Sequence, residues 1–353
     1  MSIMIREIEE QPEALERTLA LELPRIRRFR RLLERERPPL IVLAARGTSD
    51  NAALFGRYLL ELTTGTLVSL AAPSVLTLYR RRLRWQGALV VGISQSGEST
   101  DTNLLLEAAR RGGARVVGIT NEPSSSMTRL VDHLFLVRAG KERSVAATKT
   151  YTGQLLMMYL LAYALGAPIE PARLERIPAL VARALRLKQA VAELAVRYRY
   201  MEHAVVVGRG LNYANAFEFS LKLMETCRVV AERFSGADFL HGPIAVVGRS
   251  FPVFVFAPPG PTWPTTRSML GKLRRLGAET VVISDPANAA SFRYATRSIQ
   301  APGPMPISTG APADLFTPIP YIVPAQLFAA SLAAEKGLNP DRPPALRKIT
   351  RTL

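Results

Sequence analysis

The sequence predicts an α/β protein of two tandem, duplicated domains, each with a five-stranded parallel sheet between two layers of helices. Two observations support this fold class: short Val-rich runs alternate with helical stretches in both halves, and matched segments recur at one offset. Continuous apolar runs are typical of strands covered on both faces, because a strand with one solvated face alternates polar and apolar residues. The predicted architecture is therefore a three-layer, flavodoxin-like sandwich.

The duplication is visible at two places in the chain. An apolar run followed by an Arg-Gly turn and a helical pattern occurs at 40–49 and again at 203–212. Residues 109–121 match residues 272–285 in the same way, and the offset is about 164 residues at both places. Two matches at one offset predict that a whole domain was duplicated.

The predicted strands follow in chain order. In the first half they are 40–45, 65–70, 88–93, 115–119 and 133–137, and in the second half 203–208, 228–232, 252–257, 280–284 and 297–301. The predicted organisation is a helical lead-in at 1–37, a first domain at 38–165, a helical bridge at 166–200, a second domain at 201–338 and an irregular tail at 339–353.

Composition limits the class of protein. The 353 residues suffice for two hydrophobic cores, and the longest apolar run, 155–166, is too short to span a bilayer. The single cysteine, Cys227, excludes an internal disulfide, fits a reducing, cytoplasmic location, and is expected to be a packed helix residue. No His/Cys cluster has the spacing of a zinc site, so we expect no metal and no membrane association.

The net charge of +17 has two interpretations. Phosphate neutralisation in a nucleic-acid complex is one of them. The other is an arginine-rich composition, since the arginines, including those of 25–31 and 80–84, are expected on amphipathic helices and no DNA-reading motif is present. We favour the second and expect no nucleic-acid partner, although a positive field would attract a phosphorylated substrate.

A cluster of hydroxyl groups follows the third predicted strand. Residues 94–100 read Ser-Gln-Ser-Gly-Glu-Ser-Thr and precede a helical stretch at 101–111. Ligands of open parallel sheets bind beyond the carboxyl ends of the strands, and a helix N-terminus offers N–H donors and positive charge to a phosphate. One serine could simply cap a helix, but four hydroxyls predict a phosphate site, which Thr48 and Ser49 would help to line.

The matching loop of the second half, residues 257–264, reads Ala-Pro-Pro-Gly-Pro-Thr-Trp-Pro. Prolines lack the N–H donor that a phosphate needs. The sequence therefore predicts one phosphate pocket per chain, in the first half.

The second half carries a different set of candidates. Glu218, Lys222 and Glu225 are spaced i, i+4, i+7 on a helix expected at about 213–228, so they share one face. On an exposed helix they would form an ordinary salt-bridge ladder. Together with His241, which lies in a Gly-Pro loop, they predict an acid/base site for moving a proton between two carbons of a sugar.

Further signatures accompany these residues. In chain order the set is Arg46–Ser49, Ser94–Glu98, Gly118–Asn121, Val145–Lys149, Gly208–Gly210, the helix with Glu218, Lys222 and Glu225, His241–Pro243 and Leu346–Thr350. The set resembles the isomerase half of glucosamine-6-phosphate synthase and its relatives, which have two sugar-isomerase (SIS) domains. It covers nearly the whole chain in the family's order.

The resemblance implies roles for individual residues. The 6-phosphate of a hexose or hexosamine would be held by Ser49, Ser94, Gln95, Ser96 and Ser99, and Thr48, Val145 and Ala147 would add substrate contacts. Glu225 would shuttle the C1–C2 proton, Lys222 and Glu218 would assist it, His241 would open the ring, and Lys348 would approach the C2 carbonyl, as an amine able to form an imine. The family implies a homodimer with shared active sites, in which His241 can come from the partner, and no cofactor.

Two departures from the synthase pattern narrow the prediction. We expect that no glutaminase domain precedes Met1, and position 147 is Ala where the synthase pattern has Ser. With the tail at 341–350, these features resemble the SIS-type glucosamine-6-phosphate deaminases, which interconvert glucosamine 6-phosphate with fructose 6-phosphate and ammonia. The alternatives are a galactosamine-6-phosphate deaminase, a deglycase of fructosamine phosphates, a ketose–aldose isomerase, or a sugar-phosphate sensor without catalytic activity.

Overall fold

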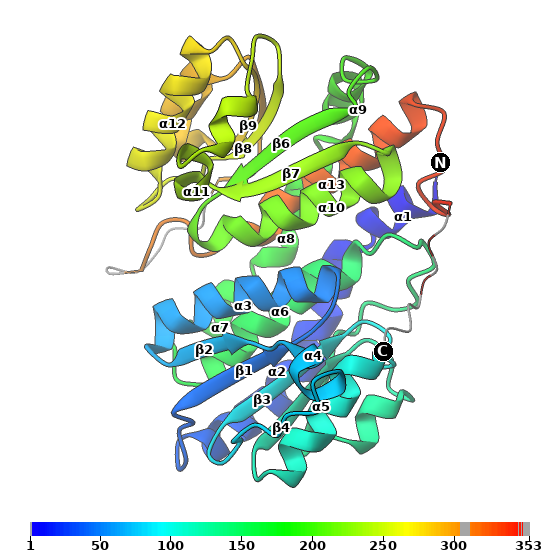
Figure 1. The fold of residues 1–353 in the computed structure, drawn as a ribbon, viewed down its shortest axis with the longest axis vertical. Coiled ribbons are helices and arrows are strands. Elements are labelled where there is room, and N and C mark those ends of the chain that lie inside the picture. Colours follow the sequence, from blue (N-terminus) through cyan, green and yellow to red (C-terminus); the bar gives the residue numbers. More distant parts are fainter. Residues whose placement is uncertain (1, 304–310, 345, 347, 349–353) are drawn as a thin grey trace. The chain divides into compact units, whose positions relative to one another are not determined.

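The computed structural model describes residues 2–303, 311–344, 346 and 348, and its chain forms two compact units (Figure 1). We name each unit by its sheet. The first-sheet unit contains Glu13–Glu142 and Lys149–Arg176 together with Lys348, and the second-sheet unit contains residues 2–12, Arg143–Thr148 and the described part of Ile177–Leu346.

The sheet of the first-sheet unit has the order β2-β1-β3-β4-β5, with every pair parallel. Its strands are β1 (Leu40–Ala44), β2 (Leu67–Leu70), β3 (Leu89–Ser94), β4 (Arg115–Thr120) and β5 (His133–Leu136). Its helices are α2 (Gln11–Leu33), α3 (Thr48–Thr64), α4 (Pro73–Thr77), α5 (Thr100–Arg111), α6 (Lys149–Ala164) and α7 (Pro171–Leu174), with a 3₁₀ turn at Ser126–Arg129. Helices α3 and α6 pack together, whereas α5 packs against β3 and β4 and also contacts α4.

The sheet of the second-sheet unit repeats this order, as β10-β9-β8-β6-β7. Its strands are β6 (His203–Gly208), β7 (Val230–Ser235), β8 (Pro252–Phe256), β9 (Glu279–Ser284) and β10 (Arg297–Gln300). Its helices are α1 (Ile3–Glu9), α8 (Ile177–Leu185), α9 (Lys188–Val196), α10 (Tyr213–Cys227), α11 (Gly236–Leu240), α12 (Trp263–Arg275) and α13 (Pro318–Glu335), with 3₁₀ turns at Gly210–Asn212, Pro243–Val246 and Pro286–Tyr294. Helix α13 contacts α1, α8, α9 and α10.

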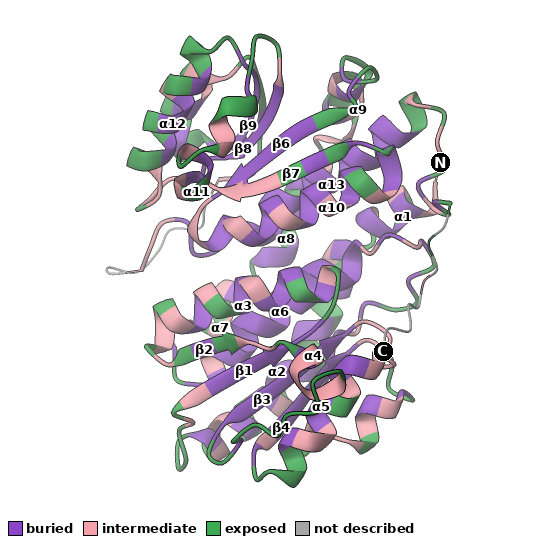
Figure 2. Ribbon diagram, viewed as in Figure 1, coloured by how far each residue is buried: buried purple, intermediate pink, exposed green. Residues whose placement is uncertain are grey.

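The two sheets confirm the predicted fold class. Every residue of β3 and β8 is buried, which explains why these strands read as uninterrupted apolar runs (Figure 2). Helix α6 is almost wholly buried as well, so the apolar run at 155–166 belongs to a core helix. Within the described residues, no helix combines the length and the apolarity that a membrane crossing requires.

Three local predictions need correction. Strand β2 begins at Leu67 and not at residue 65, because Gly65 ends α3 in the left-handed conformation, with φ of 70°. Strand β7 begins at Val230 and not at residue 228, because Arg228 ends α10 in the left-handed conformation, with φ of 54°. Residues 80–84 do not form an amphipathic helix: helix α4 ends at Thr77, Arg80 has φ of 52°, and residues 78–84 form an exposed irregular segment.

Candidate active site

The strand order of the first sheet places two polar loops next to each other, at the carboxyl ends of neighbouring strands. Strands β1 and β3 are neighbours, and the chain leaves β1 toward β2 on one side and reaches β3 on the other. This reversal of strand order is where ligands bind in open α/β sheets. Helix α3 begins at Thr48 directly after β1, and α5 begins at Thr100 after β3, so both loops lead into helix N-termini.

The serines of the loop after β3 shape its backbone. Ser94 Oγ accepts a hydrogen bond from the N–H of Gly97 at 3.1 Å, and Ser96 Oγ accepts one from the N–H of Glu98 at 3.2 Å. Ser99 stands at the N-cap of α5 but makes no capping bond, and its hydroxyl pairs instead with Thr102 Oγ1 at 3.0 Å. A hydroxyl that accepts a hydrogen bond still has a proton to donate, so Ser94 and Ser96 can also serve a phosphate.

The carbonyls of this loop are held by residues that follow β4. Gln95 O accepts from the N–H of Asn121 at 3.1 Å, and Gly97 O accepts from the N–H of Met127 at 3.2 Å. Gly97 has φ of 65°, and a Cβ on it would lie 2.1 Å from Ser125 Oγ. The loop therefore requires glycine at 97, for its conformation and for lack of space.

The loop after β1 is fixed to its neighbours. Ser49 is buried, and its hydroxyl accepts a hydrogen bond from Gln154 Nε2 of α6 at 2.9 Å. Arg46 donates to Asp101 Oδ2 from Nη2 at 2.7 Å and from Nε at 3.2 Å, which joins the β1 loop to the first turn of α5. A guanidinium at this edge adds the positive charge that a phosphate would need. The sequence did not predict this pair, since its partners are far apart in the chain.

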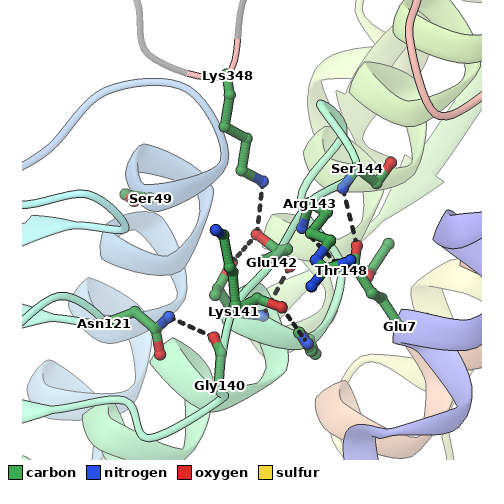
Figure 3. A network of polar contacts seen from close by, with 12 residues as sticks. Glu7, Ser49, Asn121, Gly140, Lys141, Glu142, Arg143, Ser144, Thr148 and Lys348 are labelled. Carbon is green, nitrogen blue, oxygen red and sulfur yellow. Dashed lines mark hydrogen bonds and ion pairs between the residues drawn. The ribbon is translucent and has the colours of Figure 1, made fainter.

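A buried carboxylate that the sequence analysis missed holds the described part of the tail. Glu142 accepts hydrogen bonds from Lys348 Nζ at 2.9 Å, from the Thr150 hydroxyl at 2.7 Å and from the Thr150 N–H at 3.2 Å (Figure 3). Glu142 thereby also stabilises the N-terminus of α6. Its position three residues before the Val145–Lys149 signature was the available signal.

The side chain of Asn121 supports the segment that leads to Glu142. Asn121 Oδ1 accepts from the N–H of Ala139 at 2.9 Å, and its Nδ2 donates to Gly140 O at 2.8 Å (Figure 3). Its backbone N–H is bonded to Gln95 of the serine loop. One residue therefore connects the serine loop to the segment that carries Glu142.

In the second-sheet unit, helix α10 carries the predicted charged residues. Lys222 Nζ lies 3.3 Å from Glu218 Oε1 and 2.5 Å from Glu225 Oε2. The side chains of Glu218 and Lys222 are completely buried, whereas that of Glu225 is 22% exposed. This arrangement is not a solvated salt-bridge ladder, because only one of the three side chains reaches the surface. A buried charge cluster costs stability compared with apolar packing, which favours a functional role.

The charge of Lys222 is stabilised by its two partners. Burial by itself disfavours the ammonium, but the carboxylates of Glu218 and Glu225 outweigh burial and raise the pKa of Lys222 above its ordinary value. Lys222 therefore stays protonated at neutral pH and acts as a fixed cation beside Glu225, not as a base.

The remaining predicted residues of this unit lie on loops. His241 is exposed directly after α11, where its N–H donates to Asp238 O at 3.0 Å. Among the described residues, no hydrogen bond or ion pair is found between the His241 ring and the α10 carboxylates. Val145 and Ala147 are half-buried on the segment Arg143–Thr148. The predicted residues thus fall into two groups, one in each unit.

Cys227 is a packed structural residue, as predicted. It is buried at the end of α10, and its thiol donates to Ala329 O at 3.1 Å. Burial raises the pKa of the Cys227 thiol to about 11, so it remains protonated and is a poor nucleophile. In the part of the chain that the structure describes, no group of three His, Cys, Asp or Glu side chains is placed to hold a metal ion.

Comparisons with known proteins show similarity over both halves of the chain. A sequence model of the SIS domain matches residues 36–164 and 198–336. The glutamine–fructose-6-phosphate aminotransferase (isomerizing) of Methanothermobacter thermautotrophicus is 34% identical over 345 residues, which are 98% of this chain and 56% of that protein. The chain thus spans about half the length of the curated relatives it matches.

Solved structures show the same similarity. The C-terminal domain of glucosamine-fructose-6-phosphate aminotransferase from Francisella tularensis aligns with a TM-score of 0.86 and 29% identity, over 97% of this chain and 98% of that one. Glucosamine-6-phosphate deaminase from Thermotoga maritima aligns with a TM-score of 0.77 and 20% identity, over 99% of this chain and 100% of that one, which shows the fold alone.

Proposed function

The chain belongs to the SIS domain family, and we propose that it interconverts glucosamine 6-phosphate with fructose 6-phosphate and ammonia. One observation carries the proposal: a completely buried Lys222 holds two carboxylates, and only Glu225 reaches the surface. A carboxylate kept beside a fixed cation suits repeated uptake and release of a proton from carbon. The names of the relatives supply the class of substrate, an amino- or keto-hexose 6-phosphate.

Phosphate recognition is assigned to the first-sheet unit. Hydroxyls of Ser49, Ser94, Ser96 and Ser99, with Thr48, Gln95 and the N–H groups at the start of α5, would bind the 6-phosphate. Hydroxyl and backbone donors hold a monophosphate through several bonds without a permanent charge at each contact. Arg46, paired with Asp101, contributes positive potential at the same edge.

Proton transfer is assigned to the second-sheet unit. His241 opens the sugar ring by moving a proton between the ring oxygen and the C1 hydroxyl. Glu225 removes the C2 proton of open-chain glucosamine 6-phosphate, and the electron pair forms the C1=C2 bond of an enolamine while the C1=O double bond opens and O1 takes up a proton from solvent. Return of that proton to C1 gives the C2 imine, which water hydrolyses to fructose 6-phosphate and ammonia. In this scheme Lys222 and Glu218 keep the Glu225 carboxylate in place.

Lys348 is assigned to C2 of the sugar. As an ammonium it would stabilise negative charge that develops near the C2 carbonyl. In the reverse direction, Glu142, whose oxygen lies 2.9 Å from Nζ, would accept a proton from Nζ. The free amine would then attack the C2 carbonyl of fructose 6-phosphate, and loss of water would give an imine. Val145 and Ala147 would contribute contacts to the sugar.

The assembly and location belong to the same proposal. We propose a homodimer with shared active sites, in which His241 acts within its own chain or from the partner. We also propose a cytoplasmic location and turnover without a cofactor.

Ammonia release tests the proposal directly. We expect the protein to release ammonia from glucosamine 6-phosphate and to form fructose 6-phosphate, and we expect Glu225→Gln to lower kcat by about a thousandfold. Glu193→Gln, an exposed change on α9, is the matched control and should retain full activity. If no hexosamine 6-phosphate yields ammonia, the proposed reaction is wrong.

A panel of substrates separates the alternatives. Turnover of galactosamine 6-phosphate would identify the other deaminase, and turnover of fructosamine phosphates would identify the deglycase. Turnover of simple ketose phosphates would identify the ketose–aldose isomerase. Tight binding of a hexose 6-phosphate with no turnover of any panel member would instead identify a sensor.

A further inference from the structure

Helix α1 has only seven residues, and its N-terminus is closed by a residue from the other end of the chain. Asp341 Oδ2 accepts from the N–H of Ile3 at 2.8 Å, and Oδ1 accepts from the N–H of Met4 at 2.7 Å. Ser2 Oγ accepts from the N–H of Ile5 at 3.2 Å. A carboxylate at the positive end of a helix makes strong, charge-assisted bonds, so Asp341 ties the tail to α1.

The same two elements hold the segment Arg143–Thr148. The backbone carbonyl of Asp341 accepts from the N–H of Val145 at 3.1 Å. Glu7, a buried residue of α1, accepts from the N–H of Arg143 at 2.5 Å and from that of Ser144 at 3.2 Å (Figure 3). Three successive backbone N–H groups of this segment are thus bonded to α1 or to Asp341.

The far end of the segment is held by helix α13. Gln326 is completely buried, and its Nε2 donates to Thr148 O at 3.3 Å. Its Oε1 accepts from Gln11 Nε2 at 2.7 Å. The segment is therefore held at both ends within the second-sheet unit, and we call Glu7, Asp341 and Gln326 the α1 clamp.

The chain that leaves the α1 clamp leads to residues of the proposed reaction. Glu142 directly precedes Arg143, and Lys348 follows Asp341 by seven residues, so both partners of the Glu142–Lys348 ion pair are covalently close to a clamped residue. Val145 and Ala147 lie inside the clamped segment. Apolar packing of Met4 and Ile8, which are fully buried, could hold α1 without the buried carboxylate of Glu7.

We infer that the α1 clamp positions residues of the proposed reaction. Asp341 anchors the tail and so restricts where Lys348 can lie, and Glu7 fixes the segment that contains Val145 and Ala147. The inference rests on the proposed function for its catalytic consequence. A tether anchored close to a reactive group keeps that group at high local concentration, and small misplacements of reacting groups lower rates strongly. Glu7 and Asp341 are positioning residues, since neither is proposed to touch the substrate.

The first experiment compares Asp341→Ala with Ser2→Ala. Both remove bonds from the N-terminus of α1, but only the first frees the tail. We expect Asp341→Ala to speed amide hydrogen exchange at Val145 and at Leu346 of the tail, and to lower kcat about tenfold or more with KM for the hexose 6-phosphate within about twofold. Ser2→Ala should leave exchange of the tail and kcat near wild type. Asp341→Asn, which keeps one acceptor oxygen, should recover part of kcat.

The second experiment tests Glu7 in the same way. Glu7→Gln should speed exchange at Arg143 and Ser144. Glu9→Gln, a change on the same helix that weakens the 2.6 Å pair with Lys188 of α9, should not. The inference is wrong if amide hydrogen exchange at residues 143–145 and in the tail is unchanged in both Asp341→Ala and Glu7→Gln. It is also wrong if Ser2→Ala lowers kcat as much as Asp341→Ala does. Amide hydrogen exchange can be measured whether or not the protein is active. If the wild-type protein is inactive but the variants exchange faster, the proposed function is refuted and the α1 clamp is still established. If Asp341→Ala does not fold, Asp341→Asn and Glu7→Gln supply the same readouts.

Discussion

The two sheets of this protein share one strand order but differ in the loop that follows the third strand. After β3 the loop contains Ser94, Ser96 and Ser99, and its carbonyls are bonded to residues after β4. After β8 the equivalent loop, residues 257–264, contains four prolines, which have no N–H to donate. The two copies thus share the sheet, while only the loop after β3 has the serines that we propose bind phosphate.

The helices that follow the first strand of each sheet differ in the opposite sense. Helix α3 carries the solvent-facing pair Arg57–Glu61, with 3.7 Å between Nε and Oε1. Helix α10 carries charges of similar spacing, but Lys222 is buried between Glu218 and Glu225. The same charge pattern in sequence is therefore a surface feature in one copy and a buried cluster in the other.

Breaking the buried cluster should have the largest effect on stability. Lys222→Met leaves Glu218 and Glu225 without their cation, and we expect a loss of about 3–5 kcal/mol in the free energy of unfolding. Arg57→Ala on α3 should cost about 0.5 kcal/mol or less, because exposed pairs contribute little. Urea unfolding of both variants measures the difference. Similar small losses would show that burial does not distinguish the two helices.

The buried carboxylates in the segments that precede α6 and α13 also differ, because only one of them is paired with a cation in the part of the chain that the structure describes. Glu142 has Lys348 as its cation, whereas Asp314, in the part of the chain described here, has no ion pair, and burial raises the pKa of Asp314 to about 6. The folded state therefore favours the protonated form of Asp314. Its contribution to stability is fully present below about pH 4 and is lost as the pH rises through about 6.

Asp314→Asn should remove this pH dependence. We expect wild type and variant to be equally stable near pH 4, and the variant to be more stable by about 3 kcal/mol at pH 8, from 1.36 kcal/mol for each of roughly two pKa units. Urea unfolding from pH 4 to 8 tests this, with Glu193→Gln as control. A stability difference that does not change with pH would contradict the expectation.

Glycine variants compare the two loops after β3 and β8. Gly97→Ala places a Cβ at φ of 65° and against Ser125, and we expect about tenfold weaker binding of a hexose 6-phosphate with a stability loss of about 1–2 kcal/mol. Gly260→Ala in the second loop, at φ of 110°, should cost stability and leave this affinity unchanged. Calorimetric titration with glucosamine 6-phosphate separates the two outcomes. Equal effects on affinity would mean that the β3 loop has no special role.

Ser99→Ala should have the smallest effect on the fold. Because Ser99 makes no capping bond, we expect a stability change of about 0.5 kcal/mol or less, with affinity for the hexose 6-phosphate reduced severalfold. A loss of about 1 kcal/mol or more with unchanged affinity would instead identify an ordinary helix cap.

Sequence patterns predicted the sheets well because the central strands are buried on both faces. Strands such as β3 and β8 show this burial as continuous apolar runs, and a polar cluster at the end of such a run predicts a ligand site. The boundary error at β7 arose from Arg228, whose left-handed conformation no propensity predicts for an arginine. The arginines at 80–84 were misassigned because charge alone does not distinguish a helix face from an exposed loop.

The sequence by itself determined the duplicated α/β fold, the serine loop and the spacing of the α10 charges, since each can be recognised from short stretches of consecutive residues. Only the tertiary structure decided that Lys222 is buried, that Glu142 binds Lys348, and that Asp341 closes helix α1. The physical reason is that burial and long-range pairing depend on groups that distant segments bring together. Asp341 and Ile3 are 338 positions apart, and no local pattern records that separation.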